Sequence, residues 1–269
     1  MDKWTSQTSD NDIKACCADF YSSDVVKWLL EDSYHPGGLL LTGRMGEYLD
    51  LGPGDVVLDV ASGTGASAMS LADKFGCRVM GIDLSQANVD AANRAAQASE
   101  VSDLVSFITG DAESLPLEDA RFDAVICECS FCIFPDQPAA AAEFARVLRP
   151  GGRFGISDLN LNTELPPELD SVLGSIICVA GAQTPAGYKE ILSGAGLSVD
   201  AVHHYDDELL LLIASIRQKL IGATIIARTQ EIALPDLDLD RALDTARWAS
   251  NAMQRGELGY SLLVGRKPA

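Results

Sequence analysis

The chain has 269 residues, and its 20 Lys and Arg residues against 39 Asp and Glu residues give a formal charge of 20 − 39 = −19. This acidity argues against nucleic acid or an anionic membrane as a partner, since both need clustered cations. The apolar share of 47% is that of a globular protein, and the longest apolar run, residues 209–215, is too short to cross a bilayer. Seven cysteines, an odd number, follow a polar N-terminus without a secretory signal, which favours reduced thiols in the cytoplasm.

Helix-like and strand-like patterns alternate from residue 56 to residue 159. The preceding stretch, residues 16–50, has the apolar spacing typical of helices and is interrupted at residues 35–38. Helices that connect strands in this way make the strands parallel, so the sequence predicts an α/β fold with a doubly wound, mostly parallel sheet. The expected strands are 56–61, 77–85, 105–112, 122–129 and 152–159, and the expected helices are 66–76, 86–99 and 139–149.

The C-terminal part has a different pattern. Two helical segments are expected within 160–200, two more at 206–229 and 239–255, and a strand at 259–267. We expect this strand to join the sheet edge in the antiparallel direction, which makes the helices before it an insertion within one domain. The predicted divisions are an N-terminal helical segment that forms part of a pocket lid (1–50), a cofactor-binding core (51–200), and a helical cap with the final sheet strand (201–269).

A glycine-containing loop, Asp59-Val60-Ala61-Ser62-Gly63-Thr64-Gly65, follows the first expected strand and opens a helix. Gly63 and Gly65 allow a ligand to approach the backbone, and the helix start offers unpaired N–H groups. The loop lacks the Lys-Ser/Thr of a P-loop and the third glycine of the dinucleotide fingerprint. Asp59 would repel a pyrophosphate and attract a cation, so the loop predicts a nucleoside cofactor with a cationic amino-acid end.

Two more carboxylates follow at the ends of the next strands. Asp83 ends the second strand, where a carboxylate can accept both hydroxyl protons of a ribose. Asp111, followed by Ala112, ends the third strand. With Asp59, these residues place three carboxylates at three successive strand ends, which predicts one binding site along that edge of the sheet.

Four segments of the chain resemble the successive motifs of class I S-adenosylmethionine-dependent methyltransferases. They are VVLDVASGTG, GIDLS, GDAESLPLEDARFDAV and RVLRPGGRFGISDL, between about residues 55 and 160. The resemblance implies a seven-stranded sheet of that type and S-adenosylmethionine as cofactor, with Gly63 and Gly65 under its methionine part. It also implies that Asp83 binds the ribose and that Asp111 and Ala112 border the adenine. The remaining expected cofactor contacts are Asp59, Ala61, Leu84, Glu128 and Tyr21.

The cysteines lie in segments that point to the substrate. Cys127, Cys129 and Cys132 end the fourth strand, where open α/β sheets bind ligands, whereas Cys77 begins a strand and is expected to be buried in the core. Strand alternation places Cys127 and Cys129 on one face. Thiolates gathered at a substrate mouth suit a soft, thiophilic centre, and a structural zinc site is the alternative.

A second resemblance is to trivalent arsenical methyltransferases. It rests on residues 162–182, which include Cys178, on residues 188–197, and on the segment with Cys16 and Cys17, while residues 201–258 have no counterpart. It implies that Cys129, Cys178 and one of Cys16 or Cys17 hold arsenic(III) with its lone pair towards the methyl group. The first hypothesis is therefore methylation of thiol-bound arsenic, with a thiol reductant such as glutathione or thioredoxin as partner.

Other functions stay open. The helical insertion favours O-, C- or S-methylation of a small organic metabolite, for which His35 is a candidate general base. A non-catalytic protein with a cofactor-binding fold or a bound metal is the third alternative. In each case the expected partner is a small molecule or a metalloid.

Overall fold

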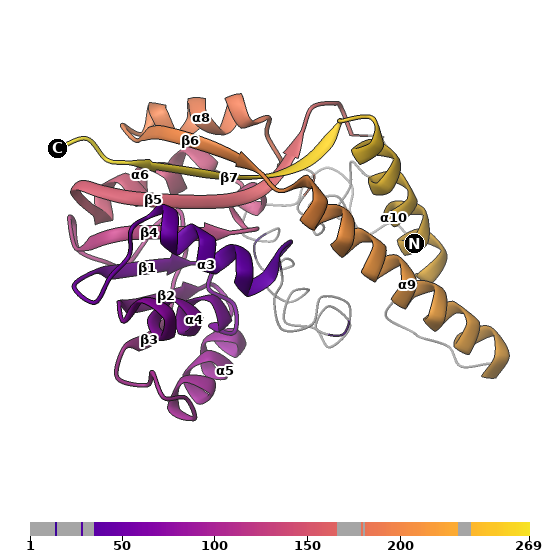
Figure 1. The fold of residues 1–269 in the computed structure, drawn as a ribbon, viewed down its shortest axis with the longest axis horizontal. Helices are drawn as coiled ribbons and strands as arrows, with labels where there is room; N and C mark the ends of the chain where they lie inside the picture. Colours follow the sequence, from indigo (N-terminus) through magenta and orange to yellow (C-terminus); the bar gives the residue numbers. More distant parts are fainter. Residues whose placement is uncertain (1–13, 15–27, 29–34, 166–178, 180, 231–237) are drawn as a thin grey trace.

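The computed structural model of the chain describes residues 35–165, 181–230 and 238–269, together with Lys14, Trp28 and Val179. A seven-stranded sheet with the order β3-β2-β1-β4-β5-β7-β6 forms its centre (Figure 1). The strands from β3 to β5 in this order are parallel, and β7 is antiparallel to both of its neighbours. The strands are β1 (Val56–Val60), β2 (Arg78–Asp83), β3 (Val105–Thr109), β4 (Phe122–Glu128), β5 (Leu148–Leu161), β6 (Ser198–His204) and β7 (Leu258–Arg266).

Helices cover both faces of the sheet. Right-handed crossovers from β1 to β2 and from β2 to β3 place α4 and α5 on one face, where α3 packs against α4. The strand order reverses between β1 and β4, so the crossover helix α6 lies on the opposite face together with α8 (Figure 1). The helices are α3 (Gly38–Tyr48), α4 (Ala66–Phe75), α5 (Gln86–Gln97), α6 (Gln137–Val147), α8 (Pro185–Gly194), α9 (Asp206–Gln230) and α10 (Leu239–Gln254), with a 3₁₀ turn, η1 (Phe131–Ile133).

The predicted doubly wound, mostly parallel seven-stranded sheet with a helical insertion is confirmed. The position of the final strand was predicted wrongly, because β7 lies between β5 and β6 and is not the edge strand. The edge is β6 (Ser198–His204), a strand that the sequence pattern did not reveal, since its side chains are only partly buried and do not alternate cleanly. The division of the chain at residues 50 and 200 stays a prediction.

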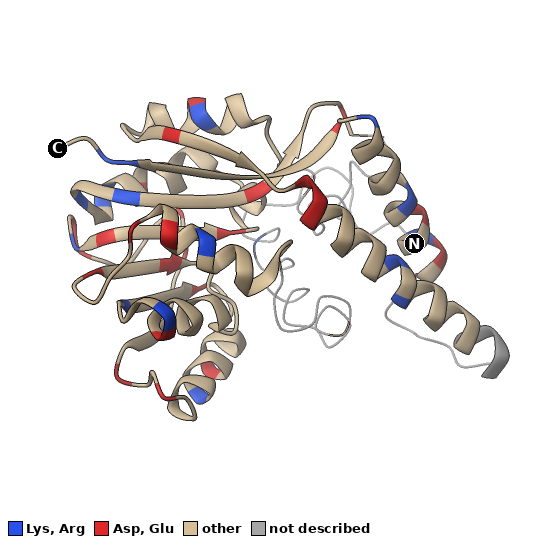
Figure 2. Cartoon of the chain, in the orientation of Figure 1, with Lys and Arg blue, Asp and Glu red and all other residues tan. Residues whose placement is uncertain are grey.

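The helical insertion projects beyond the sheet as a hairpin of α9 and α10 (Figure 1). α9 begins with the acidic residues 206–208, which favour the positive end of the helix dipole (Figure 2). It packs against β7 and α10, while Leu211 and Ile225 are among its exposed apolar residues. Residues 206–226 have a mean hydropathy of 1.7, so this helix, unlike the short run noted in the sequence, is long and apolar enough to cross a membrane by length and composition alone.

Candidate functional site

The candidate site is a cavity at the carboxyl ends of β1, β2 and β4, at the point where the strand order reverses. This is where open α/β sheets bind ligands, because the loops diverge there and leave a crevice. The cavity is lined by residues of the glycine loop, of the β2 and β3 ends, of the β4 end, and by Lys14 and His35.

The glycine loop makes a tight turn between β1 and α4. Gly65, with a φ of 84°, caps α4, and a Cβ there would lie 2.5 Å from the ring of Phe107. Gly63, with a φ of 54°, instead faces open space, so a Cβ would project without meeting another atom within 4 Å. The loop therefore needs Gly65 for packing and keeps Gly63 bare next to the cavity.

Asp83 ties the end of β2 to this loop. Its Oδ2 accepts the N–H of Gly63 at 2.8 Å, and its Oδ1 accepts the N–H of Ser85 at 2.9 Å and the amide of Asn88 at 3.2 Å. Burial raises the pKa of Asp83, and these three hydrogen bonds counteract the shift. The carboxylate is therefore fixed in orientation at the cavity wall, as a ribose-binding role requires.

Asp59 is a buried carboxylate without a complete set of partners. It is 2% exposed, and among the described residues its Oδ2 has no hydrogen-bond partner. Burial raises the pKa of Asp59 well above its usual value, and the nearby charges of Glu128 and Asp83 raise it further. A cation in the cavity would lower this pKa and offset the repulsion between the carboxylates.

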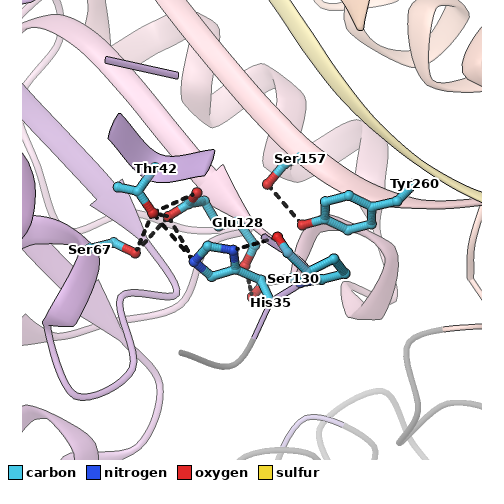
Figure 3. A network of polar contacts seen from close by, with 8 residues as sticks. His35, Thr42, Ser67, Glu128, Ser130, Ser157 and Tyr260 are labelled. Atoms are coloured by element: carbon cyan, nitrogen blue, oxygen red, sulfur yellow. Dashed lines mark hydrogen bonds and ion pairs between the residues drawn. The ribbon is translucent and has the colours of Figure 1, made fainter. Parts of the chain in front are cut away.

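A polar network lies at the end of β4 (Figure 3). Both carboxylate oxygens of Glu128 accept hydrogen bonds from Thr42 of α3, at 3.1 and 3.0 Å, and Ser67 of α4 donates to one of them at 2.6 Å. The Nε2 of His35 lies 3.5 Å from the same oxygen, and its Nδ1 lies 3.2 Å from the carbonyl oxygen of Pro36. Since His35 is 6% exposed, the network is shielded from bulk water but lines the cavity.

The cysteines separate into packed and cavity-lining residues. Cys77 is fully buried, and burial raises the pKa of its thiol to about 11, as expected for a core cysteine. Cys127 and Cys132 are also buried. Cys129 follows β4 with a φ of 50° and lines the cavity. Of the cysteines in the described residues, Cys129 is thus the one that lines the cavity.

Most of the expected cofactor contacts meet in the cavity. Lining residues that the sequence indicated are Asp59, Ala61, Gly63, Asp83, Leu84, Asp111, Ala112, Glu128 and Cys129. Gly65 supports the loop from behind. Cys16, Cys17, Tyr21 and Cys178 lie outside the described residues, so their roles stay predictions. Within the described part of the chain, no group of three or more His, Cys, Asp and Glu residues could hold a metal ion.

Sequence reasoning missed four polar residues of the site. Ser67 and Asn88 lie just after predicted strand-end loops, at the starts of α4 and α5, and that position could have identified them. Lys14 lines the cavity, and Thr42 reaches the Glu128 network from α3, but nothing in the surrounding sequence distinguishes either residue.

Comparison with known proteins identifies the fold and the chemistry. Residues 58–156 match the family described as a methyltransferase domain. A 27-O-demethylrifamycin SV methyltransferase from Amycolatopsis mediterranei is 40% identical over 234 residues, which cover 85% of this chain and 83% of the relative. The chain belongs to the class I S-adenosylmethionine-dependent methyltransferases.

Two further similar proteins differ from the rifamycin relative in the reaction that their names describe. An arsenite methyltransferase from Halobacterium salinarum is 29% identical over 202 residues, covering 73% of this chain and 51% of the relative. Among solved structures, the [4+2]-cyclase SpnF has a TM-score of 0.75 at 22% identity, over 94% of this chain and 95% of that chain. The structural likeness shows the fold, and that protein's name shows that the fold alone does not determine the reaction.

S-adenosylmethionine is the cofactor of the methyltransferase, and the cavity fits it. The unpartnered Asp59 oxygen suits a ligand that carries an ammonium and a sulfonium group, and bare Gly63 leaves room beside it. The assignments of Asp83 to the ribose and of Asp111 to the adenine stay predictions. When bound, the cofactor supplies an electrophilic methyl group.

Proposed function

We propose that the methyltransferase methylates a hydroxyl oxygen of a small organic molecule and that His35 is the general base. The observation that carries this proposal is the His35–Glu128 pair at the end of β4, in the wall of the cofactor cavity. A neutral hydroxyl is a weak nucleophile, so its attack is accelerated when a positioned base removes the proton.

The network provides such a base. In the proposed mechanism, the Pro36 carbonyl accepts the Nδ1 proton of His35 and orients the ring, so that the lone pair is on Nε2. Nε2 takes the proton of the acceptor hydroxyl, and the Glu128 carboxylate, 3.5 Å from Nε2, stabilises the imidazolium that forms. Thr42 and Ser67 hold the Glu128 carboxylate in place. The apolar side chains of Ile133 and Phe134 line the same cavity and suit the carbon skeleton of an organic acceptor.

The rifamycin relative supports the same acceptor class, because its printed name describes methylation of an O-demethyl compound and its match covers most of both chains. The match to the arsenite methyltransferase covers less of this chain.

Methylation of arsenic(III) is the second candidate. It is favoured by Cys129, a thiol in the cavity wall next to Glu128, and by the arsenite methyltransferase relative. The ligand set of this candidate is Cys129, Cys178 and one of Cys17 or Cys16, and all of these except Cys129 lie outside the described part of the chain. It would require a thiol reductant such as glutathione or thioredoxin.

The test is transfer of a labelled methyl group to a panel of alcohols, phenols and hydroxylated macrocycles, with arsenite plus glutathione as a separate arm. We expect label on a hydroxyl acceptor. The His35→Gln variant should lower kcat by about 10²-fold or more while S-adenosylhomocysteine binds as in the wild type. Cys129→Ser should retain most of this activity, and His203→Gln, which alters a histidine stacked on Tyr48, is the matched control.

Label transfer to arsenite but to no hydroxyl, abolished in Cys129→Ser, would overturn the proposal in favour of the second candidate. Protection of Cys129 from alkylation by arsenite would support the same conclusion. An unchanged kcat in His35→Gln would remove His35 as the base.

A further inference from the structure

Lys14 lines the same cavity as the His35–Glu128 pair, and it contacts the segment that follows β3. Its Nζ lies 2.7 Å from Oδ2 of Asp111 and 2.5 Å from Oε2 of Glu113. Lys14 is 14% exposed, Glu113 13% and Asp111 34%. One ammonium group therefore bridges two carboxylates that are 97 and 99 residues away in the sequence.

Each of the two carboxylates also accepts a hydrogen bond from a backbone N–H. The Oδ1 of Asp111 accepts the N–H of Glu113 at 3.0 Å, and the Oε1 of Glu113 accepts the N–H of Asp136 at 2.8 Å. Their other oxygens converge on Lys14. Burial alone would lower the pKa of Lys14, but hydrogen bonds to Asp111 and Glu113 raise it, so the ammonium is charged at neutral pH.

We propose that Lys14 is a positioning residue of the methyl-donor site, which fixes the Asp111 carboxylate so that it recognises the amino group of the adenine. The proposal uses the predicted placement of the adenine beside Asp111, and it does not depend on the identity of the methyl acceptor. With both oxygens bound to protein donors, Asp111 presents its remaining lone pairs in one orientation. Without Lys14, Asp111 and Glu113 are like charges side by side, and the hydrogen bond from the Glu113 N–H to Oδ1 is the protein contact left to orient the Asp111 carboxylate among the described residues.

The test needs no acceptor. Binding of S-adenosylhomocysteine and of S-inosylhomocysteine, which carries an oxygen in place of the adenine amino group, is measured by calorimetry on the full chain. We expect Lys14→Met to weaken binding of the adenosyl compound about ten-fold, about the loss of one charge-assisted hydrogen bond, and to change binding of the inosyl compound much less. Lys14→Arg should restore the preference for adenine.

Lys74→Met is the matched control, because Lys74 also forms an ion pair with a carboxylate, that of Glu47 at 2.7 Å, but does not line the cavity. Glu113→Gln is a second variant that leaves both Lys14 and Asp111 in place, and it should reduce the preference for adenine less than Lys14→Met. Thermal melts show that each variant is folded. Equal loss of affinity for both compounds in Lys14→Met would overturn the proposal, because Lys14 would then only anchor the chain. No loss of affinity for either compound would overturn it as well. Failure of methyl transfer to any hydroxyl would contradict the proposed function and leave this result unaffected.

Discussion

Replacing Asp59 with Asn should make the unliganded protein more stable while it weakens cofactor binding. Asp59 is 2% exposed, its Oδ2 has no hydrogen-bond partner among the described residues, and the charges of Glu128 and Asp83 lie near it. Asn has almost the same shape, so the substitution leaves no cavity. It removes a charge that the folded protein stabilises poorly and that the bound cofactor is expected to need.

The size of the effect follows from the difference between a charged and a neutral group buried without a partner, which is of the order of the unsatisfied-group cost itself, about 1–3 kcal/mol. For a chain of this length, each kcal/mol changes Tm by roughly 2–4 °C. We therefore expect the Asp59→Asn variant to melt several degrees above the wild type without cofactor. S-adenosylmethionine should bind the variant more weakly, because the carboxylate that faces its cationic groups is gone.

The pH dependence provides the sharper measurement. Burial raises the pKa of Asp59 above the unfolded value of 3.8, so the folded protein holds the proton more tightly than the unfolded chain. Wild-type stability therefore falls as the pH rises from about 4 through the raised pKa. The variant lacks this titration, so the difference in Tm should grow with pH and level off above the folded pKa.

Melting curves at several pH values between 4 and 8, recorded by circular dichroism without ligand, test this expectation. Calorimetric titration with S-adenosylmethionine at neutral pH tests the binding. A variant that is less stable than the wild type by the same amount at every pH would refute the reasoning, because Asp59 would then be satisfied in the folded protein.

Two other perturbations separate folding from binding. Gly65→Ala should lower the free energy of unfolding in urea by several kcal/mol, because its Cβ would lie 2.5 Å from the ring of Phe107. Gly63→Ala has open space, so it should lower the free energy of unfolding by only about 1 kcal/mol through backbone strain, and it should weaken S-adenosylhomocysteine binding. Equal losses of stability in the two variants would contradict this expectation. Thr42→Val removes the hydroxyl that donates to both oxygens of Glu128, so we expect a stability loss of about 1–3 kcal/mol by thermal melting and a lower kcat, and an unchanged kcat would separate Thr42 from the base network.

The sequence was sufficient to locate the part of the site that binds the methyl donor. Asp83 and Asp111 end neighbouring parallel strands, and parallel strands bring their carboxyl ends to one edge of a sheet, so local patterns alone predict that they share a cavity. Gly63 could be assigned in the same way, because the strand, loop and helix that surround it are contiguous in the chain.

The contacts that Thr42 and Lys14 make in the site could not be predicted in this way. Thr42 and Glu128 are 86 residues apart, and Lys14 and Asp111 are 97 apart, so their contacts depend on how α3 and the N-terminal part of the chain pack on the sheet. The insertion of β7 between β5 and β6 is a choice of pairing partner, which a strand's own pattern does not encode. The position of Cys129 directly after a strand predicts that it lies at the cavity, and Cys129 is one of the lining residues. Its chemistry depends on residues that are distant in the sequence, so the local pattern does not predict it.

The α9–α10 hairpin is inserted between two neighbouring strands of the sheet, so it could be replaced without changing the sheet. The chain leaves the sheet at the end of β6, His204, and returns at the start of β7, Leu258, and these antiparallel neighbours pair as far as His204 with Ser261. A short turn could join the two strands without altering the register of any other pair. Length and composition between residues 206 and 257 can therefore vary while the cavity keeps its walls, because none of its lining residues lies in α9 or α10.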